Sequence, residues 1–228
     1  METITLKYSP VLKSTDIPLE ASKSESNRAL IINAISGNQS SLKNLSNARD
    51  TQTMLRLLAS EEETLDVLDA GTTMRFLTAY SILGDKPRVL TGTDRMQQRP
   101  IKILAKALQQ IGAKVKFLKE DGYPPHKVYP LAAQKNDSIN IKGDVSSQFI
   151  SALLMIAPSL PNGLTLELKG KIGSRPYIQM TLDMMELFGI STAWTNNSIE
   201  IRPQSYGAYD YAVESDWSGA SYWYSFVA

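Results

Sequence analysis

The chain has 228 residues, 43% of them apolar and 21% charged, which is the composition of a globular domain with a sizeable core. Its 24 Lys and Arg nearly balance its 23 Asp and Glu, so no overall field favours nucleic acid, and any anion site has to be a local cluster. The absence of cysteine excludes disulfides and thiolate nucleophiles, and a single histidine excludes multi-histidine metal sites.

Two segments bear on the cellular location and on the histidine. The first ten residues, METITLKYSP, lack the pattern of a signal peptide, and the most apolar stretch, residues 149–157, is too short to cross a bilayer. We therefore expect a cytoplasmic protein without a membrane partner. His126 lies in the turn-rich segment DGYPPHKVYP, which predicts a solvated position on a surface loop.

The first unit of the chain starts with a helix that is apolar nearly all round. The segment SNRALIINAISG predicts this helix, which should be buried on every side and end at Gly37. The segment SSLKNLSNARD predicts a short strand and a turn that carries Arg49, and TQTMLRLLAS predicts a second helix. Two cations and two hydroxyls precede the apolar run: Lys23, Ser24, Ser26 and Arg28.

The second unit repeats this order. TMRFLTAYSILG predicts a buried helix that ends at Gly84, and RVLTGTDRMQQRP predicts a strand and a turn with Arg99. A second helix follows up to Gly112, and AKVKFL is strand-like after it. The helix is amphipathic because its apolar residues recur at steps of three and four: Ile101, Leu104, Leu108 and Ile111. The buried helix starts with Gly71, Thr72, Thr73 and Arg75.

The third unit has the same parts. SQFISALLMIAP predicts a buried helix that ends at Pro158, LTLELKGKIGSRP predicts a strand and a turn with Arg175, and YIQMTLDMMELFGI predicts a helix that stops at Gly189. The buried helix starts with Ser146, Ser147 and Gln148. Three such units predict one α/β domain over residues 15–213, with three buried helices, three exposed helices and pseudo-threefold character.

The polar starts of the three buried helices allow two interpretations. Ser and Thr cap helix N-termini, so capping accounts for the hydroxyls at any one start. Capping does not account for Lys23, Arg28 and Arg75, because a cation beside the positive end of a helix costs about 0.3–1 kcal/mol unless an anion compensates it. The pattern favours a phosphate or carboxylate ligand. No segment fits a phosphate-binding P-loop, so a nucleotide triphosphatase is disfavoured.

Six segments together resemble the 5-enolpyruvylshikimate-3-phosphate (EPSP) synthase family of enolpyruvyl transferases. They are SKSESNRAL, DAGTTMRFLTA, LTGTDRMQQRPI, GDVSSQFISALLM, SRPYIQMTLDMM and the crossover-like VESDWSGASYWYSFVA. The resemblance implies two similar domains, each an inside-out α/β barrel of three βαβαββ-type repeats, with the active site between them. It implies transfer of the enolpyruvyl group of phosphoenolpyruvate to the 5-hydroxyl of shikimate 3-phosphate, with release of phosphate and without a metal or organic cofactor.

The resemblance also implies roles for individual residues. Lys23 and Gln148 match catalytic positions that contact both ligands. Positions that hold shikimate 3-phosphate are matched by Lys23, Ser24, Arg28, Ser146, Ser147, Gln148, Ser174 and Tyr177. Positions on the phosphoenolpyruvate side are matched by Lys23, Gly71, Thr72, Arg99 and Gln148, with Arg75 in a supporting role. Asp69, Phe76 and Trp217 depart from the residues that are common in the family at their positions.

The family's chains are about twice as long, so the resemblance covers the N-terminal half. Residues 1–14 and 214–228 correspond to crossover segments of a second domain that is largely absent, and this domain supplies further acid/base groups. We therefore expect the chain to bind substrate but to be inactive alone. Two alternatives are the sister enzyme UDP-N-acetylglucosamine enolpyruvyl transferase, most members of which use a loop cysteine, and a non-catalytic anion-binding module of the same fold.

Overall fold

The computed structural model describes residue 5 and residues 16–227. The helices are α1 (Lys23–Ile35), α2 (Arg49–Leu58), α3 (Gly71–Tyr80), α4 (Asp94–Gln97), α5 (Lys102–Ile111), α6 (Ser147–Ile156), α7 (Arg175–Leu187) and α8 (Trp217–Val227), with 3-10 turns η1 (Ser81–Leu83) and η2 (Ala157–Ser159). The strands are β1 (Leu42–Lys43), β2 (Thr64–Asp66), β3 (Arg88–Thr91), β4 (Val115–Phe117), β5 (His126–Val128), β6 (Ser138–Lys142), β7 (Leu164–Lys169), β8 (Ala193–Thr195), β9 (Ser198–Ile201) and β10 (Tyr211–Ala212).

The second and third units form two four-stranded sheets of the same topology. One sheet has the order β2-β3-β5-β4 and the other β6-β7-β9-β8. In each sheet the first pair is parallel and the other two pairs are antiparallel. A helix joins the parallel strands, because parallel neighbours need a crossover, and a second helix leads to the antiparallel pair. Both units therefore have the predicted βαβαββ order.

The first unit has no four-stranded sheet. Only residues 59–63 separate α2 from β2, which is too short for an antiparallel pair of strands. Instead, β1 pairs in parallel with β10, with Leu42 opposite Tyr211, and Ala21 forms an antiparallel bridge with Ser215. The chain thus returns after the third unit to pair with the first.

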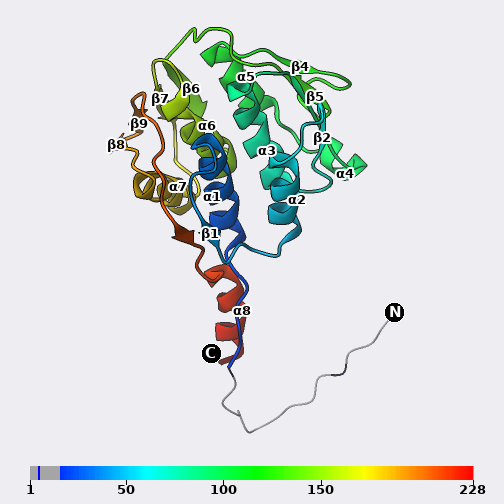
Figure 1. Ribbon diagram of the computed structural model, residues 1–228, viewed down its shortest axis with the longest axis vertical. Coiled ribbons are helices and arrows are strands. Elements are labelled where there is room, and N and C mark those ends of the chain that lie inside the picture. Colours follow the sequence, from blue (N-terminus) through cyan, green and yellow to red (C-terminus); the bar gives the residue numbers. More distant parts are fainter. Residues whose placement is uncertain (1–4, 6–15, 228) are drawn as a thin grey trace.

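The core lies where the three predicted buried helices, α1, α3 and α6, pack against one another (Figure 1). Every residue of α3 except Tyr80, and every residue of α6 except Gln148, is buried. In α5 the predicted apolar stripe is buried in full: Ile101, at its N-cap, and Leu104, Leu108 and Ile111. The distinction between helices that are buried all round and amphipathic helices is confirmed at these elements.

The prediction for His126 was wrong. Its side chain is 0% exposed, because residues 126–128 form β5, which pairs with both β3 and β4 in the middle of the sheet. Burial lowers the pKa of the imidazole to about 4, so the ring is neutral at physiological pH. The neighbouring prolines and glycine resemble a loop, although the strand itself starts directly after them.

Helix α8 extends from the body of the molecule (Figure 1) and carries exposed aromatic side chains, among them Trp217, Tyr222 and Tyr224. Two backbone hydrogen bonds join its approach to the start of α1: Ser22 N to Glu214 O at 2.8 Å, and Asp216 N to Glu20 O at 2.7 Å. Within the described part of the chain, no helix is both long and apolar enough to cross a membrane. The prediction for residues 1–14 falls outside the described residues, apart from residue 5.

Candidate anion site at the starts of the buried helices

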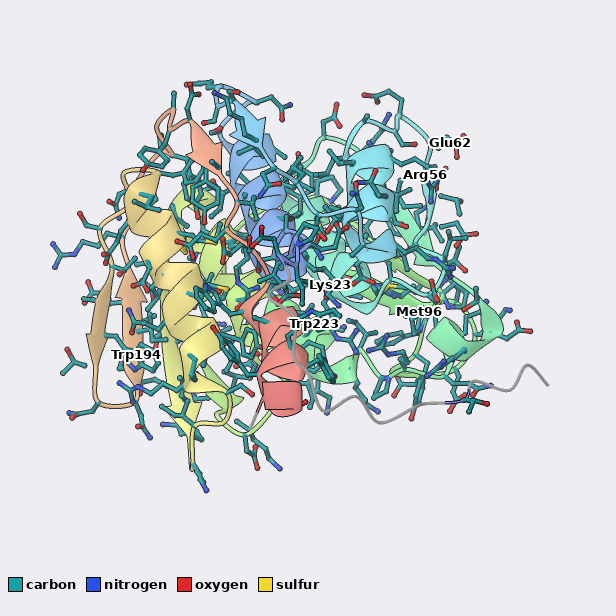
Figure 2. All side chains as sticks on the ribbon, turned by 90° about the horizontal axis from the view of Figure 1, so that it is seen from below. Lys23, Arg56, Glu62, Met96, Trp194 and Trp223 are labelled. Atoms are coloured by element: carbon teal, nitrogen blue, oxygen red, sulfur yellow. The ribbon has the colours of Figure 1, made fainter. Side chains whose placement is uncertain are left out.

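The start of α1 is capped by Ser22 rather than by the predicted candidates Ser24 or Ser26. Glu25 N donates to Ser22 Oγ at 3.3 Å. The Ser26 hydroxyl donates to Ser22 O at 2.8 Å and accepts from Ser46 N at 3.0 Å, so it joins the start of α1 to the loop before α2. Lys23 is exposed, and Figure 2 shows it on the face of the molecule seen from below. Capping therefore accounts for neither Lys23 nor Ser24.

Arg28, one turn further along α1, is buried, with 3% of its surface exposed. Its Nη1 donates to Ser24 O at 2.8 Å, and its Nε donates to Thr181 Oγ1 on α7 at 2.7 Å. Its Nη2 donates to Ser151 Oγ on α6 at 3.0 Å and to Tyr177 O at 3.3 Å. Burial lowers the pKa of the guanidinium to about 10, which leaves it charged at neutral pH.

At the start of α3, the guanidinium of Arg99 lies directly against the backbone of Gly71. A Cβ atom on Gly71 would stand 2.7 Å from Arg99 Cζ, so the absence of a side chain at this position permits the approach. The N-cap residue of α3 is Ala70, whose methyl side chain cannot accept a hydrogen bond from the first turn. Two of the residues that the resemblance assigns to the phosphoenolpyruvate side, Gly71 and Arg99, are thus in contact.

Arg75, in the next turn of α3, combines burial with an unpaired donor. It is 7% exposed, its Nη1 donates to Gly71 O at 2.6 Å, and its Nε has no hydrogen-bond partner among the described residues. Burial, and next the charge of Arg99, lower the pKa of Arg75 to about 10, although Asp50 acts in the opposite direction. Two neighbouring cations at a helix N-terminus form a field that favours an anion.

Sequence reasoning missed Asp50, which supplies an acid at this start. Its Oδ2 accepts from Thr72 N at 3.0 Å and its backbone carbonyl accepts from Thr73 Oγ1 at 2.8 Å, so α2 is tied to the first turn of α3. An acid in the first turn of α2 was the available signal. Arg49 forms an ion pair with Asp69 at 3.0 Å and holds the pKa of that carboxyl below its usual value.

A side-chain hydrogen bond joins the start of α6 to the start of α3. Gln148 Nε2 donates to Thr72 Oγ1 at 3.1 Å. Ser146 is the N-cap residue of α6 but makes no side-chain cap bond, and Ser147 is buried beside it. The hydroxyl of Ser146 is therefore not used for capping.

The loop before α7 packs on the loop before α6. Gly173 N donates to Gly143 O at 2.8 Å, and this contact brings the approach to Ser174 next to the approach to Ser146. Ser174 has a left-handed backbone, with φ of 50°, and is exposed at the N-cap of α7. Tyr177, in the first turn, keeps 40% of its surface exposed. Ser146 and Ser174 thus lie at the ends of two adjoining loops.

The structure connects most of the predicted residues in two groups, but it places Lys23 and Arg99 in different pockets. Contacts connect Ser24, Arg28 and Tyr177 in one group and Gly71, Thr72, Arg75, Arg99 and Gln148 in another. Arg28 links the groups, because its Cζ lies 5.6 Å from the ring centroid of Phe76 on α3. Lys23 and Arg99 line separate pockets, the first with Asn47 and Asp216 and the second with Asp69 and Arg95.

The site is rich in donors and poor in metal ligands. Guanidinium groups, hydroxyls and backbone N–H groups bind phosphate and carboxylate oxygens. Among residue 5 and residues 16–227, no group of three or more His, Cys, Asp or Glu side chains is arranged to hold a metal ion. The chemistry of the donor set is that of an anion site.

A family model and the sequences of curated relatives both match this chain, and they point to the same family. The family model of EPSP synthase (3-phosphoshikimate 1-carboxyvinyltransferase) matches residues 56–228. A 3-phosphoshikimate 1-carboxyvinyltransferase of Bacteroides fragilis is 51% identical over 218 residues, which are 95% of this chain and 53% of the relative. One of Vibrio atlanticus is 36% identical over an alignment of 258 positions, which covers 100% of this chain and 60% of the relative. The chain thus spans little more than half the length of these curated relatives.

A solved structure agrees with the fold. The EPSP synthase of Acinetobacter baumannii superposes with a TM-score of 0.77 at 18% identity, over 90% of this chain and 51% of that one. At this identity the likeness concerns the α/β fold with its mixed sheets. Since the family model matches most of the residues and the motifs occur in order along the sequence, the chain belongs to the EPSP synthase family.

Proposed function

We propose that this chain binds shikimate 3-phosphate and forms part of an enolpyruvyl transferase. Its ligands for shikimate 3-phosphate are Lys23, Ser24, Arg28, Ser146, Ser147, Gln148, Ser174 and Tyr177. Phosphoenolpyruvate is held by Lys23, Gly71, Thr72, Arg99 and Gln148, with Arg75 in support. A cytoplasmic location and the absence of nucleic-acid and membrane partners remain predictions from the sequence.

One observation carries the proposal. The hydrogen bond from Gln148 Nε2 to Thr72 Oγ1 joins the start of α6, which belongs to the proposed shikimate 3-phosphate set, to the start of α3, which belongs to the phosphoenolpyruvate set. Two substrates that react with each other must meet at near-contact distance, so their binding sets have to adjoin. Gln148 stands at the junction of the two sets and is therefore proposed to orient both reacting groups.

The reaction is addition followed by elimination. The substrate 5-hydroxyl attacks C2 of phosphoenolpyruvate while C3 takes up a proton, and the tetrahedral intermediate then loses phosphate and a proton to give the enolpyruvyl ether. Two phosphates and one carboxylate must approach one another, and they repel strongly at low dielectric. Lys23, Arg99 and the N–H groups at the helix starts are proposed to offset this repulsion.

The acid and base groups of the reaction are proposed to come from the part of the relatives that lies outside the match. The B. fragilis relative has only 53% of its length in the matched part. The exposed aromatic side chains of α8, including Trp217 and Tyr222, support a contact with further protein mass at that end. On this proposal the chain of 228 residues binds substrate without turning it over.

Calorimetric titration of the chain with shikimate 3-phosphate tests the binding part. We expect saturable binding that is at least tenfold weaker for shikimate, which lacks the phosphate and its charge-assisted hydrogen bonds. Ser147→Ala should weaken binding severalfold, whereas Ser191→Ala, an exposed serine next to β8, serves as the matched control. No heat at millimolar ligand would refute the binding proposal.

Mixing tests the catalytic part. The chain is combined with the separately expressed second half of the B. fragilis relative, and phosphate release is measured with both substrates. Release that needs both proteins supports the transferase. A complex that forms and stays silent favours a non-catalytic anion-binding module. Turnover with UDP-N-acetylglucosamine in place of shikimate 3-phosphate would instead indicate the sister enzyme.

A further inference from the structure

Two hydroxyls lie in the core behind the proposed shikimate 3-phosphate site. Ser151 on α6 and Thr181 on α7 are both 0% exposed, and their oxygens are 2.7 Å apart. Neither residue can touch a ligand in the cleft, because both are completely enclosed by protein. Each accepts a hydrogen bond from Arg28, as described above.

The direction of every hydrogen bond in this cluster follows from the number of protons. Thr181 Oγ1 lies 2.8 Å from Tyr177 O, a carbonyl that can only accept, so the single hydroxyl proton of Thr181 is used there. Thr181 Oγ1 therefore accepts from Ser151 Oγ, and Ser151 in turn accepts from Arg28 Nη2. The three side chains therefore form a closed ring of hydrogen bonds, in which each hydroxyl proton has a single acceptor.

This ring leaves Arg28 little freedom. A guanidinium has five N–H bonds, and four of them are given to Ser24 O, Thr181 Oγ1, Ser151 Oγ and Tyr177 O. Counting the bonds to residues that the structure describes, one Nη1–H remains for a ligand. Because Tyr177 O also accepts from Thr181, the same bonds fix the first turn of α7, on which the half-exposed Tyr177 side chain is mounted.

We propose that Thr181 and Ser151 are positioning residues for shikimate 3-phosphate, which act by aiming the remaining Nη1–H of Arg28 and by holding the first turn of α7. The inference rests on the proposed function, since it concerns the affinity of that site. It assigns part of the substrate affinity to two side chains that never contact the substrate.

Two variants distinguish the effect of the Thr181 hydroxyl group from the effect of the side-chain volume. Thr181→Val keeps the volume and removes the hydroxyl, whereas Thr181→Ser keeps the hydroxyl and removes a methyl group. We expect Thr181→Val to weaken binding of shikimate 3-phosphate about tenfold and Ser151→Ala about threefold, because the buried Arg28 donors lose their acceptors. Thr181→Ser should bind within about twofold of the unmodified chain. Titrations are made well below each variant's unfolding midpoint, so that all proteins are folded.

Ser81→Ala is the matched control for Ser151→Ala. Ser81, the C-cap residue of α3, is a buried serine too, but its hydroxyl donates to Leu77 O and contacts none of the three residues of the ring. Equal loss of affinity in Thr181→Val and Thr181→Ser would overturn the inference in favour of packing. Unchanged affinity in Thr181→Val would also overturn it while the proposed function stands. Absence of binding by the unmodified chain would overturn both.

Discussion

Arg28 and Arg75 occupy corresponding places in the second turns of α1 and α3, but their hydrogen-bond partners differ. Each donates from Nη1 to the carbonyl four residues earlier, Ser24 O or Gly71 O. Each also lies over a phenylalanine of the next buried helix: Arg28 Cζ is 5.6 Å from the ring centroid of Phe76, and Arg75 Cζ is 5.4 Å from that of Phe149.

The remaining donors differ. Arg28 has three further bonds to α6 and α7, whereas the Nε of Arg75 has no partner within the described part of the chain and Arg99 stands nearby. The same local arrangement thus gives two different cations. Arg28 joins three helices through its hydrogen bonds, whereas Arg75 keeps an N–H group that could bind a ligand. A repeat can therefore keep its backbone pattern while the partners of one side chain decide what that side chain does.

The largest effect is expected from removing each arginine in turn. Arg28→Met should lower the free energy of unfolding by about 3 kcal/mol, because it leaves the carbonyls of Ser24 and Tyr177 and the two buried hydroxyls short of donors. Arg75→Met should cost about 1 kcal/mol or less, since one bond is lost and a repulsion with Arg99 is relieved. Urea unfolding of both variants measures the difference, and equal losses would contradict the comparison.

The second effect concerns another unpaired nitrogen beside α3. Thr78 donates to Met74 O, so His126 Nε2–H donates to Thr78 Oγ1 at 2.9 Å, and Nδ1 has no partner among the described residues. The folded pKa of about 4 lies below the ordinary value of 6.5. The unfolded chain therefore binds a proton that the folded chain does not, and stability falls as the pH drops from 6.5 to 4, by on the order of 3 kcal/mol.

Because His126 is the only histidine, its proton NMR signal is unambiguous and gives the folded pKa directly. Unfolding in urea at pH 7 and pH 4 gives the linked stability. His126→Phe should remove this part of the slope, whatever its effect at neutral pH. A midpoint near 6.5 in the NMR titration would show that the imidazole is solvated.

The third effect sharpens the role of the spare donors at α3. Gly71→Ala places a Cβ against the guanidinium of Arg99 and should displace it, so that phosphoenolpyruvate binds about tenfold more weakly in the presence of shikimate 3-phosphate. Thermal stability should change little, because Arg99 is exposed and can move. Gly84→Ala, where a Cβ meets only ordinary contacts, is the matched control. Equal affinities in both variants would contradict the assignment.

The smallest effect is expected at the rim of the same site. Asp69 and Arg49 form an ion pair, but both side chains are exposed, so water screens their attraction. Asp69→Asn should leave the thermal midpoint unchanged within error. A marked drop would show that the pair holds α2 to the loop before α3 more firmly than its exposure indicates.

Much of the fold could be predicted from the sequence, because the apolar pattern records which face of each element is buried. The burial of α3 on all sides, apart from Tyr80, and the stripe that includes Leu104 and Leu108 were predicted from the apolar pattern. Strand β5 was missed, since Pro124 and Pro125 directly before His126 resemble a surface loop. Pairing with two neighbouring strands, which is a long-range contact, outweighs that local signal.

The candidate site was predicted in its residues but not in its connections. The motifs located Arg28, Thr72 and Gln148, whereas Asp50 and the buried hydroxyls of Ser151 and Thr181 went unnoticed. A serine or threonine inside an apolar helix is compatible with many surroundings, and only the crossing of α1, α6 and α7 gives these two a common partner. Partners far apart in sequence leave no local pattern.

The bridge between Ala21 and Ser215 has a consequence for how such a domain can be combined with others. Hydrogen-bonded strands lie about 5 Å apart, so the chain leaves the domain almost where it came in. A host fold interrupted at one surface loop could take up residues 21–215 with little separation of its two cut ends. The pairing of β1 with β10 and the bridge between Ala21 and Ser215 thus bring the two ends of this segment together.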